Sequence, residues 1–90
     1  MSRTELENAA ESLTDAADAA GNDEARERLE KQSNQLNQLA TADRGPDHGR
    51  LARHEHIITE IADEEGGDVA DHADDALDSI HEFRETLEGV

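Results

Sequence analysis

The chain has 90 residues, enough for one small domain, and it contains no Cys, so it can form neither a disulfide nor a thiolate metal site. Its 24 Asp and Glu against 8 Lys and Arg give a formal net charge of −16, which disfavours nucleic acid and anionic lipid as partners. No apolar run is long enough to span a bilayer, and the first residues lack the apolar stretch of a secretory signal. We therefore expect a cytoplasmic protein.

Leu, Ile, Val and Phe together number 15 of 90 residues, a content that is common in disordered chains. These residues nevertheless recur with helical spacing, which predicts an ordered core. One Lys against seven Arg, with many Ala and Asp, is typical of proteins from salt-loving archaea. At about 1 M salt the Debye length is only ~3 Å, so repulsion between surface carboxylates is largely screened. We therefore expect the fold to need salt.

Three breaks that contain glycine divide the chain, at residues 21–23, 43–49 and 66–68. The segments between them have few β-branched or aromatic residues, which favours helix over strand. The pattern predicts four helices within a single domain of residues 1–90, at about residues 4–20, 23–41, 47–65 and 68–88.

The first predicted helix has an apolar stripe made mostly of alanine, which packs closely but buries little area. Ser2 and Glu5 at its start fit a capping box. The stripe consists of Leu6, Ala9, Ala10, Leu13, Ala16, Ala17 and Ala20.

The second predicted helix has Asn22 as its N-cap. In a continuous rod its apolar stripe would lie about 140° from that of the first helix. A turn, with Gly21 just after the first helix, is therefore preferred to a single bent helix. The second stripe consists of Ala25, Leu29, Gln32, Leu36, Leu39 and Ala40.

The third predicted helix has Pro46 in its first turn, and the fourth has Asp68 as its N-cap. The third stripe consists of Leu51, His54, Ile57, Ile58, Ile61 and Ala62. The fourth is a heptad seam with alternating spacings of four and three, made of Val69, Ala73, Ala76, Ile80, Phe83 and Leu87.

Four helices of similar length joined by mostly short loops predict an all-α, four-helix, up-down-up-down bundle. The alternative is a bent helical hairpin that completes its core as a homodimer, because the large apolar side chains are few.

The segment of residues 43–56 (DRGPDHGRLARHEH) is formally neutral, whereas the rest of the chain carries the whole charge of −16. It also contains the expected start of the third helix, where free N–H groups and the helix dipole favour anions. We interpret it as a contact surface for an acidic partner or a small anion. Alternatively, its arginines pair with the protein's own carboxylates. The residues assigned to the contact are Arg44, His48, Arg50, Arg53 and His56.

A second hypothesis is a small metal- or anion-binding protein that uses His48, His54 and His56. Pairs of His and Glu one helical turn apart can share a metal in a bundle interior. Two such pairs occur, His56 with Glu60 and His81 with Glu85. Both histidines fall towards the solvent side of their helices, so we assign no metal ligands and expect no cofactor.

His54 falls at the centre of the apolar face of the third helix. It is either a core or interface histidine held by a hydrogen bond, with Gln32 as a candidate partner, or a switch that responds to pH.

The acidic residues of the fourth helix form a solvated face: Asp68, Asp71, Asp74, Asp75, Asp78, Glu82, Glu85 and Glu88. The chain has neither a Gly-rich phosphate loop nor a nucleophile elbow, so we predict no catalytic residue and no enzyme activity.

The run from Asp43 to His56, set between two helical pairs, resembles a small haloarchaeal family of unknown function. The resemblance implies an archaeal, cytosolic source and a helical fold, and it implies no activity. Our leading hypothesis is a non-enzymatic helical interaction module of a halophilic cytosol. Its partner would be a protein, either a different one or a second copy of this chain.

Overall fold

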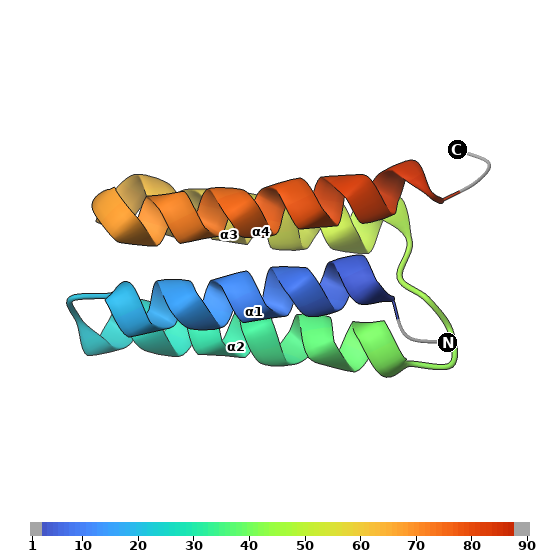
Figure 1. Cartoon of the computed structure of the whole chain (residues 1–90), viewed down its shortest axis with the longest axis horizontal. Helices are drawn as coiled ribbons and strands as arrows, with labels where there is room; N and C mark the ends of the chain where they lie inside the picture. Colours follow the sequence, from blue (N-terminus) through green and yellow to red (C-terminus); the bar gives the residue numbers. More distant parts are fainter. Residues whose placement is uncertain (1–2, 88–90) are drawn as a thin grey trace.

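The computed structural model describes residues 3–87, which form four helices (Figure 1). Neighbouring helices run in opposite directions, so the predicted up-down-up-down bundle is confirmed. Ser2 of the predicted capping box and residue 88, the predicted end of the last helix, lie outside the described residues. The helices are α1 (Thr4–Ala19), α2 (Asp23–Thr41), α3 (His48–Glu65) and α4 (Gly67–Glu85).

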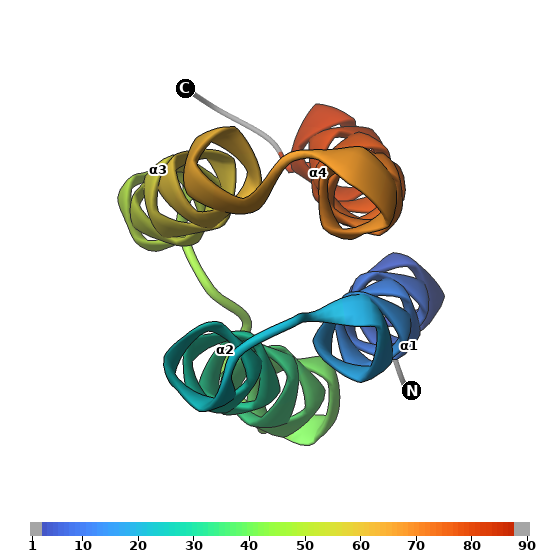
Figure 2. The ribbon, with the colours of Figure 1, turned by 90° about the vertical axis from the view of Figure 1, so that its left-hand side faces the viewer.

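The four helices occupy the corners of a square when the bundle is viewed from its end (Figure 2). Helix α1 packs closely against both α2 and α4, and α3 packs against α4. The contact between α2 and α3 is much the smallest of the four. The bundle therefore has one loosely closed side.

The core is drawn from all four helices and follows the predicted stripes closely. Small alanines of α1 and α4 let the larger side chains of the other positions meet at the centre. Three stripe residues, Leu39, Ile57 and Leu87, remain only half-buried. The largest fully buried side chains are Leu6, Leu13, Leu29, Leu36, Leu51, Ile58, Ile61 and Ile80.

Helices α1 and α2 are separate, as the angle between their stripes requires. The Asn22 side chain accepts a hydrogen bond from the Ala25 N–H at 2.8 Å, which confirms this N-cap. Gly21 follows the extended C-cap residue Ala20 and does not adopt a positive φ. The chain leaves α1 in an extended conformation, so the left-handed glycine cap is not used here.

Two predicted assignments at helix starts are wrong, Pro46 in the first turn of α3 and Asp68 as the N-cap of α4. The N-cap of α3 is Asp47, whose carboxylate accepts from the Arg50 N–H at 2.8 Å, and Pro46 lies buried before it. The N-cap of α4 is Gly66 and not Asp68. Gly66 (φ 63°) and Gly67 (φ 54°) reverse the chain so sharply that Gly66 both ends α3 and begins α4.

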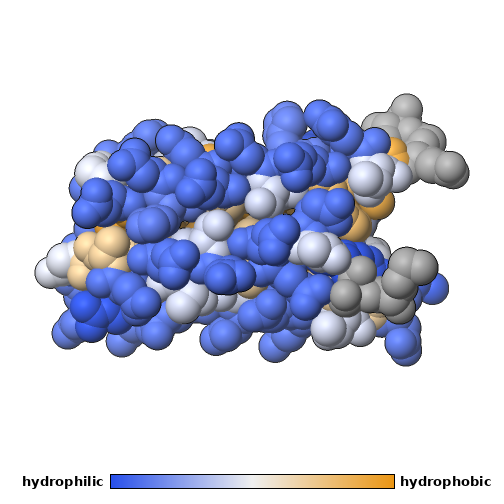
Figure 3. Space-filling model, viewed as in Figure 1, coloured by the Kyte–Doolittle hydropathy of each residue, from blue (hydrophilic) through white to orange (hydrophobic). Residues whose placement is uncertain are grey.

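The face formed by α1 and α4 is covered mostly by hydrophilic side chains (Figure 3). Among the described residues, no helix combines the length and apolarity needed to cross a membrane.

Candidate functional site

The loose contact between α2 and α3 opens into a groove, which we call the α2–α3 groove. Figure 2 shows α2 and α3 on the side of the bundle opposite the α1–α4 interface, and the groove between them has a volume of about 880 Å³. Its lining comes from residues 31–39 of α2, residues 44–47 of the connecting loop and residues 49–57 of α3. The apolar part of the lining consists of Leu39, Pro46 and Ile57.

Half of the basic residues of the chain line this groove. Asp47 is the one acidic residue in the described lining, so four positive charges and one negative charge leave a formal charge of +3. The protein as a whole carries −16. The four basic side chains, all exposed, are Lys31, Arg44, Arg50 and Arg53.

The other four basic residues are engaged inside the protein. Arg3 binds main-chain carbonyls, Arg26 lies 3.9 Å from Asp23, Arg28 pairs with Glu60 and Glu64, and Arg84 pairs with Glu55. Within residues 3–87, none of the four basic groups of the groove takes part in an ion pair. In that part of the chain, the arginines of the 43–56 segment therefore lack the internal pairs that the alternative interpretation required.

Arg3 fixes the connecting loop, which lines one end of the groove. Its Nη1 donates to the main-chain oxygens of Leu39 and Ala42, both at 2.9 Å, and its own N–H donates to Ala40. A Cβ at Gly45 would come within 3.1 Å of the Arg3 guanidinium, so the loop lies directly against it. The positive group also satisfies carbonyls at the C-terminal end of α2, where the helix dipole is negative.

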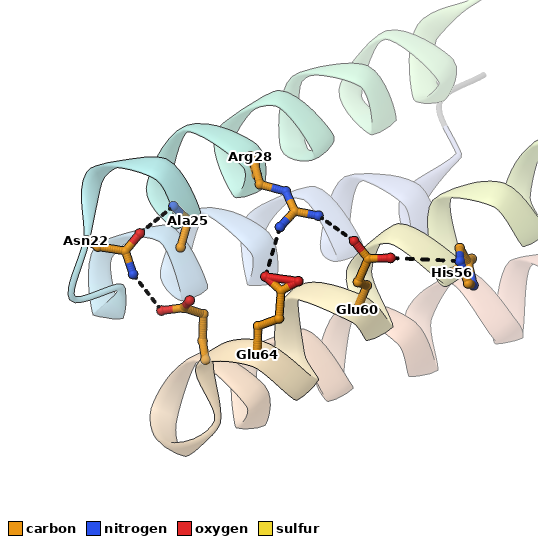
Figure 4. Close-up of polar contacts among 7 residues, drawn as sticks. Asn22, Ala25, Arg28, His56, Glu60 and Glu64 are labelled. Carbon is orange, nitrogen blue, oxygen red and sulfur yellow. Dashed lines mark hydrogen bonds and ion pairs between the residues drawn. The ribbon is translucent and has the colours of Figure 1, made fainter.

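Ion pairs close the groove at its other end (Figure 4). Arg28 of α2 donates to Glu60 and to Glu64 of α3, each at 3.1 Å. Asn22 donates to Glu65 at 3.0 Å. Because Lys31 follows Arg28 by about one turn, the groove begins where this bridge ends.

Within the groove, the side chains of His54 and Gln32 join α3 to α2. His54 Nδ1 donates to Gln32 Oε1 at 2.6 Å, and both residues are buried. Burial lowers the pKa of His54 below its ordinary value, and the positive charges of Arg50 and Arg53 lower it further. Both causes favour the neutral form of the His54 imidazole, which lies beside two guanidinium groups that form no ion pair within residues 3–87.

His48, predicted as a contact residue, faces α4 and does not line the groove. Arg84 donates from Nε to His48 Nδ1 at 3.1 Å and from Nη1 to Glu55. Glu55 in turn accepts from His81 Nδ1 at 3.2 Å. His81 thus pairs with Glu55 across the α3–α4 interface, and within residues 3–87 it forms no ion pair with Glu85, the residue one turn further along its own helix.

His56 lies near the closed end, with its Nε2 4.0 Å from Glu60 Oε2, and does not line the groove (Figure 4). The three histidines of the 43–56 segment therefore face three different neighbours: Arg84, Gln32 and Glu60. In residues 3–87, no group of three or more His, Asp or Glu side chains is arranged to hold a metal ion.

Of the five predicted contact residues, the structure brings Arg44, Arg50 and Arg53 together in one groove. Sequence reasoning missed the contribution of α2, above all Lys31. Its one available signal was that Lys31, the sole lysine, directly precedes the stripe residue Gln32. The acidic residues of α4 between Asp68 and Glu85 are exposed, as expected for a solvated face, and Glu88 lies outside the described residues.

No curated protein and no solved structure matches the chain. A family model matches residues 1–86, almost the whole length. The chain therefore belongs to this family, a family of unknown function (DUF7553).

Proposed function

We propose that the protein is a non-enzymatic interaction module whose α2–α3 groove binds an acidic segment of a partner protein. One observation carries the proposal: the four basic side chains that neither form an ion pair nor donate to a main-chain carbonyl in the described chain all line this groove. Free guanidinium groups bind carboxylates through paired, charge-assisted hydrogen bonds. The other basic residues already bind carboxylates or carbonyls of this chain. The four basic residues of the groove can therefore make such contacts with an acidic segment of a partner.

The charge of the groove also bears on the identity of the partner. Two copies that met groove to groove would oppose two formal charges of +3, and like charges across an interface weaken association. We therefore propose a different protein as the partner, and not a homodimer through this face.

We further propose that the module works in a cytosol rich in salt. The acid excess and the single lysine support this setting. In concentrated salt the attraction between distant charges is screened, so the affinity would come from direct contacts within the groove.

Capture of partners from a lysate of the source cells, at high salt, tests the proposal. The bait is the wild-type chain or the double variant Arg50→Gln/Arg53→Gln, and each captured protein is then purified and titrated directly. We expect one captured protein to bind the wild-type chain and to lose at least about tenfold in affinity with the double variant.

A matched control carries the same change in net charge elsewhere. Asn8 of α1 and Asn37 of α2 are exposed and do not line the groove, so Asn8→Glu/Asn37→Glu also lowers the charge by two. This variant should bind as the wild type does. Equal binding by all three proteins would contradict the proposed role of the groove.

A further inference from the structure

We infer that the segment bound in the groove is an amphipathic α-helix, with an aliphatic stripe between two acidic edges. The inference rests on the proposed function and names the form of the partner. It follows from the apolar lining, the placement of the basic residues, the length of the groove and the state of its backbone groups.

The apolar lining lacks a complete cover. Leu39 and Ile57 lie on the apolar stripes of α2 and α3, yet both are only half-buried. Pro46 adds an apolar side chain from the loop. A small inorganic anion would reach the guanidinium groups but would leave the exposed parts of Leu39 and Ile57 in water, whereas Pro46 is already buried. An aliphatic stripe would cover Leu39 and Ile57, and burial of apolar surface is favourable.

The basic residues stand on both sides of this apolar lining. Lys31 is on the α2 side, Arg50 and Arg53 are on the α3 side, and Arg44 is in the connecting loop. A complementary ligand therefore has acids on both edges and apolar groups between them. A helix presents this arrangement when aliphatic residues recur at spacings of three and four and acids flank them.

The length of the groove suits a short helix. The lining runs from Lys31 to Leu39 on α2 and from Gly49 to Ile57 on α3, which is eight residue steps on each helix. At a rise of 1.5 Å per residue, each side is roughly 12 Å long, the length of about two helical turns. A partner helix of three to four turns would span the groove with its ends in solvent.

The backbone groups of the groove also favour a helix over an extended strand. Both walls are helices, whose N–H and C=O groups beyond the end turns are paired within the helices themselves. An extended segment laid between them would find few backbone partners, whereas a helix satisfies its own. A second copy of this chain does not supply such a helix, because the apolar seam of its acidic α4 is buried in its own core.

The test uses three fluorescent synthetic peptides of about fifteen residues with equal acidic charge. One has leucines at helical spacing between glutamates, one is its scrambled isomer, and one is polyglutamate. Each is titrated at high salt into the wild-type chain by fluorescence anisotropy. We expect the helical peptide to bind at least about tenfold more tightly than the other two.

Two variants separate the apolar contact from the charged one. Ile57→Ser should weaken the helical peptide about tenfold and leave the scrambled isomer unchanged. Arg50→Gln/Arg53→Gln should weaken all three peptides. Leu77→Ser, which alters a half-buried leucine of α4 outside the groove, is the matched control and should bind as the wild type does. Circular dichroism confirms that each variant is folded.

The possible outcomes separate the inference of a helical ligand from the proposed docking function. Equal binding of the helical peptide and its scrambled isomer would contradict a helical ligand but would still agree with a docking site for acidic segments. Binding of inorganic phosphate that displaces the helical peptide completely at low concentration would assign the groove to a small anion. Self-association abolished by Arg50→Gln/Arg53→Gln would assign it to a second copy. If no peptide bound, and if Arg50→Gln/Arg53→Gln captured the same proteins from the lysate as the wild type, both proposals would be contradicted.

Discussion

His54 of α3 and Gln32 of α2 share a hydrogen bond of 2.6 Å. This bond joins α2 to α3, the pair of neighbouring helices that pack least closely against one another. Both side chains are buried, and Gln32 Oε1 can only accept, so the imidazole donates from Nδ1. This pair lies between the apolar core and the exposed arginines of the groove, and three expectations follow from it.

The first concerns the stability that the pair provides. His54→Leu leaves the buried Gln32 oxygen without a donor, and we expect the free energy of unfolding to fall by about 1–2 kcal/mol. His54→Leu/Gln32→Leu removes both polar groups and should recover most of this loss. Urea denaturation of the four proteins in the cycle measures the coupling. If the double variant were no more stable than the single one, the hydrogen bond would not explain the loss.

The second concerns pH. Because the pKa of His54 is lowered in the folded state, the unfolded chain takes up the proton first as the pH falls. The contribution of His54 to stability is therefore complete above about pH 6.5 and decreases as the pH falls from there through the lower folded pKa. His54→Leu/Gln32→Leu should show a smaller loss of stability between about pH 7.5 and pH 5.5 than the wild type. Identical pH profiles would contradict this assignment.

The third concerns the arginines beside the imidazole. Arg50→Gln/Arg53→Gln removes two positive charges that lower the pKa of His54, so that pKa should rise. Titration of the His54 ring by NMR measures the change. Arg26→Gln, at the other end of α2 and away from the groove, should leave it unaltered. An acidic ligand in the groove should raise the same pKa, because it offsets the same charges.

Arg3 should matter for stability although it precedes the first helix. Arg3→Met removes the donors to the carbonyl groups at the end of α2, and we expect a loss of about 2 kcal/mol in the free energy of unfolding. Arg53→Met, which removes an exposed guanidinium without an ion pair in the described chain, should change stability by no more than about 0.5 kcal/mol. Chemical denaturation of both variants checks the contrast.

The fold should depend on salt. A formal charge of −16 on 90 residues opposes a compact state, and salt screens this repulsion. Helical circular dichroism should therefore increase as sodium chloride is raised from a few millimolar to about 2 M. A full helical signal in buffer without added salt would contradict this expectation.

Much of the fold is predictable from the sequence because the apolar residues recur at helical spacing. The stripe that ends at Ala20 and the stripe that begins at Ala25 point in different directions, and this alone requires the turn between α1 and α2. The N-cap at Asn22 is predictable for a similar reason, because its hydrogen bond joins residues only three positions apart. The starts of α3 and α4 were misplaced because they depend on the path of the chain at Pro46 and Gly66, which tertiary packing determines.

The candidate site was predictable only on its α3 side. The concentration of arginines between Asp43 and His56 is visible in the sequence, and three of them do meet in the groove. That His48 faces α4 is not visible, because its direction depends on Arg84 of that helix, whereas the helical period alone places His56 towards solvent, where it is exposed. The half-burial of Leu39 and Ile57 depends on how far α2 and α3 separate, which no local pattern encodes.

The ion-pair bridge of Arg28 to Glu60 and Glu64 holds α2 and α3 at one end, while Arg3 ties down the loop at the other. Between these two fixed points few contacts set the spacing of α2 and α3, whereas the α1–α4 interface is extensive. A helix bound in the groove, as proposed, would therefore meet one hydrogen bond, between His54 and Gln32, and two half-buried side chains, Leu39 and Ile57. We expect a thicker ligand to disturb these contacts first and to leave the α1–α4 interface unchanged.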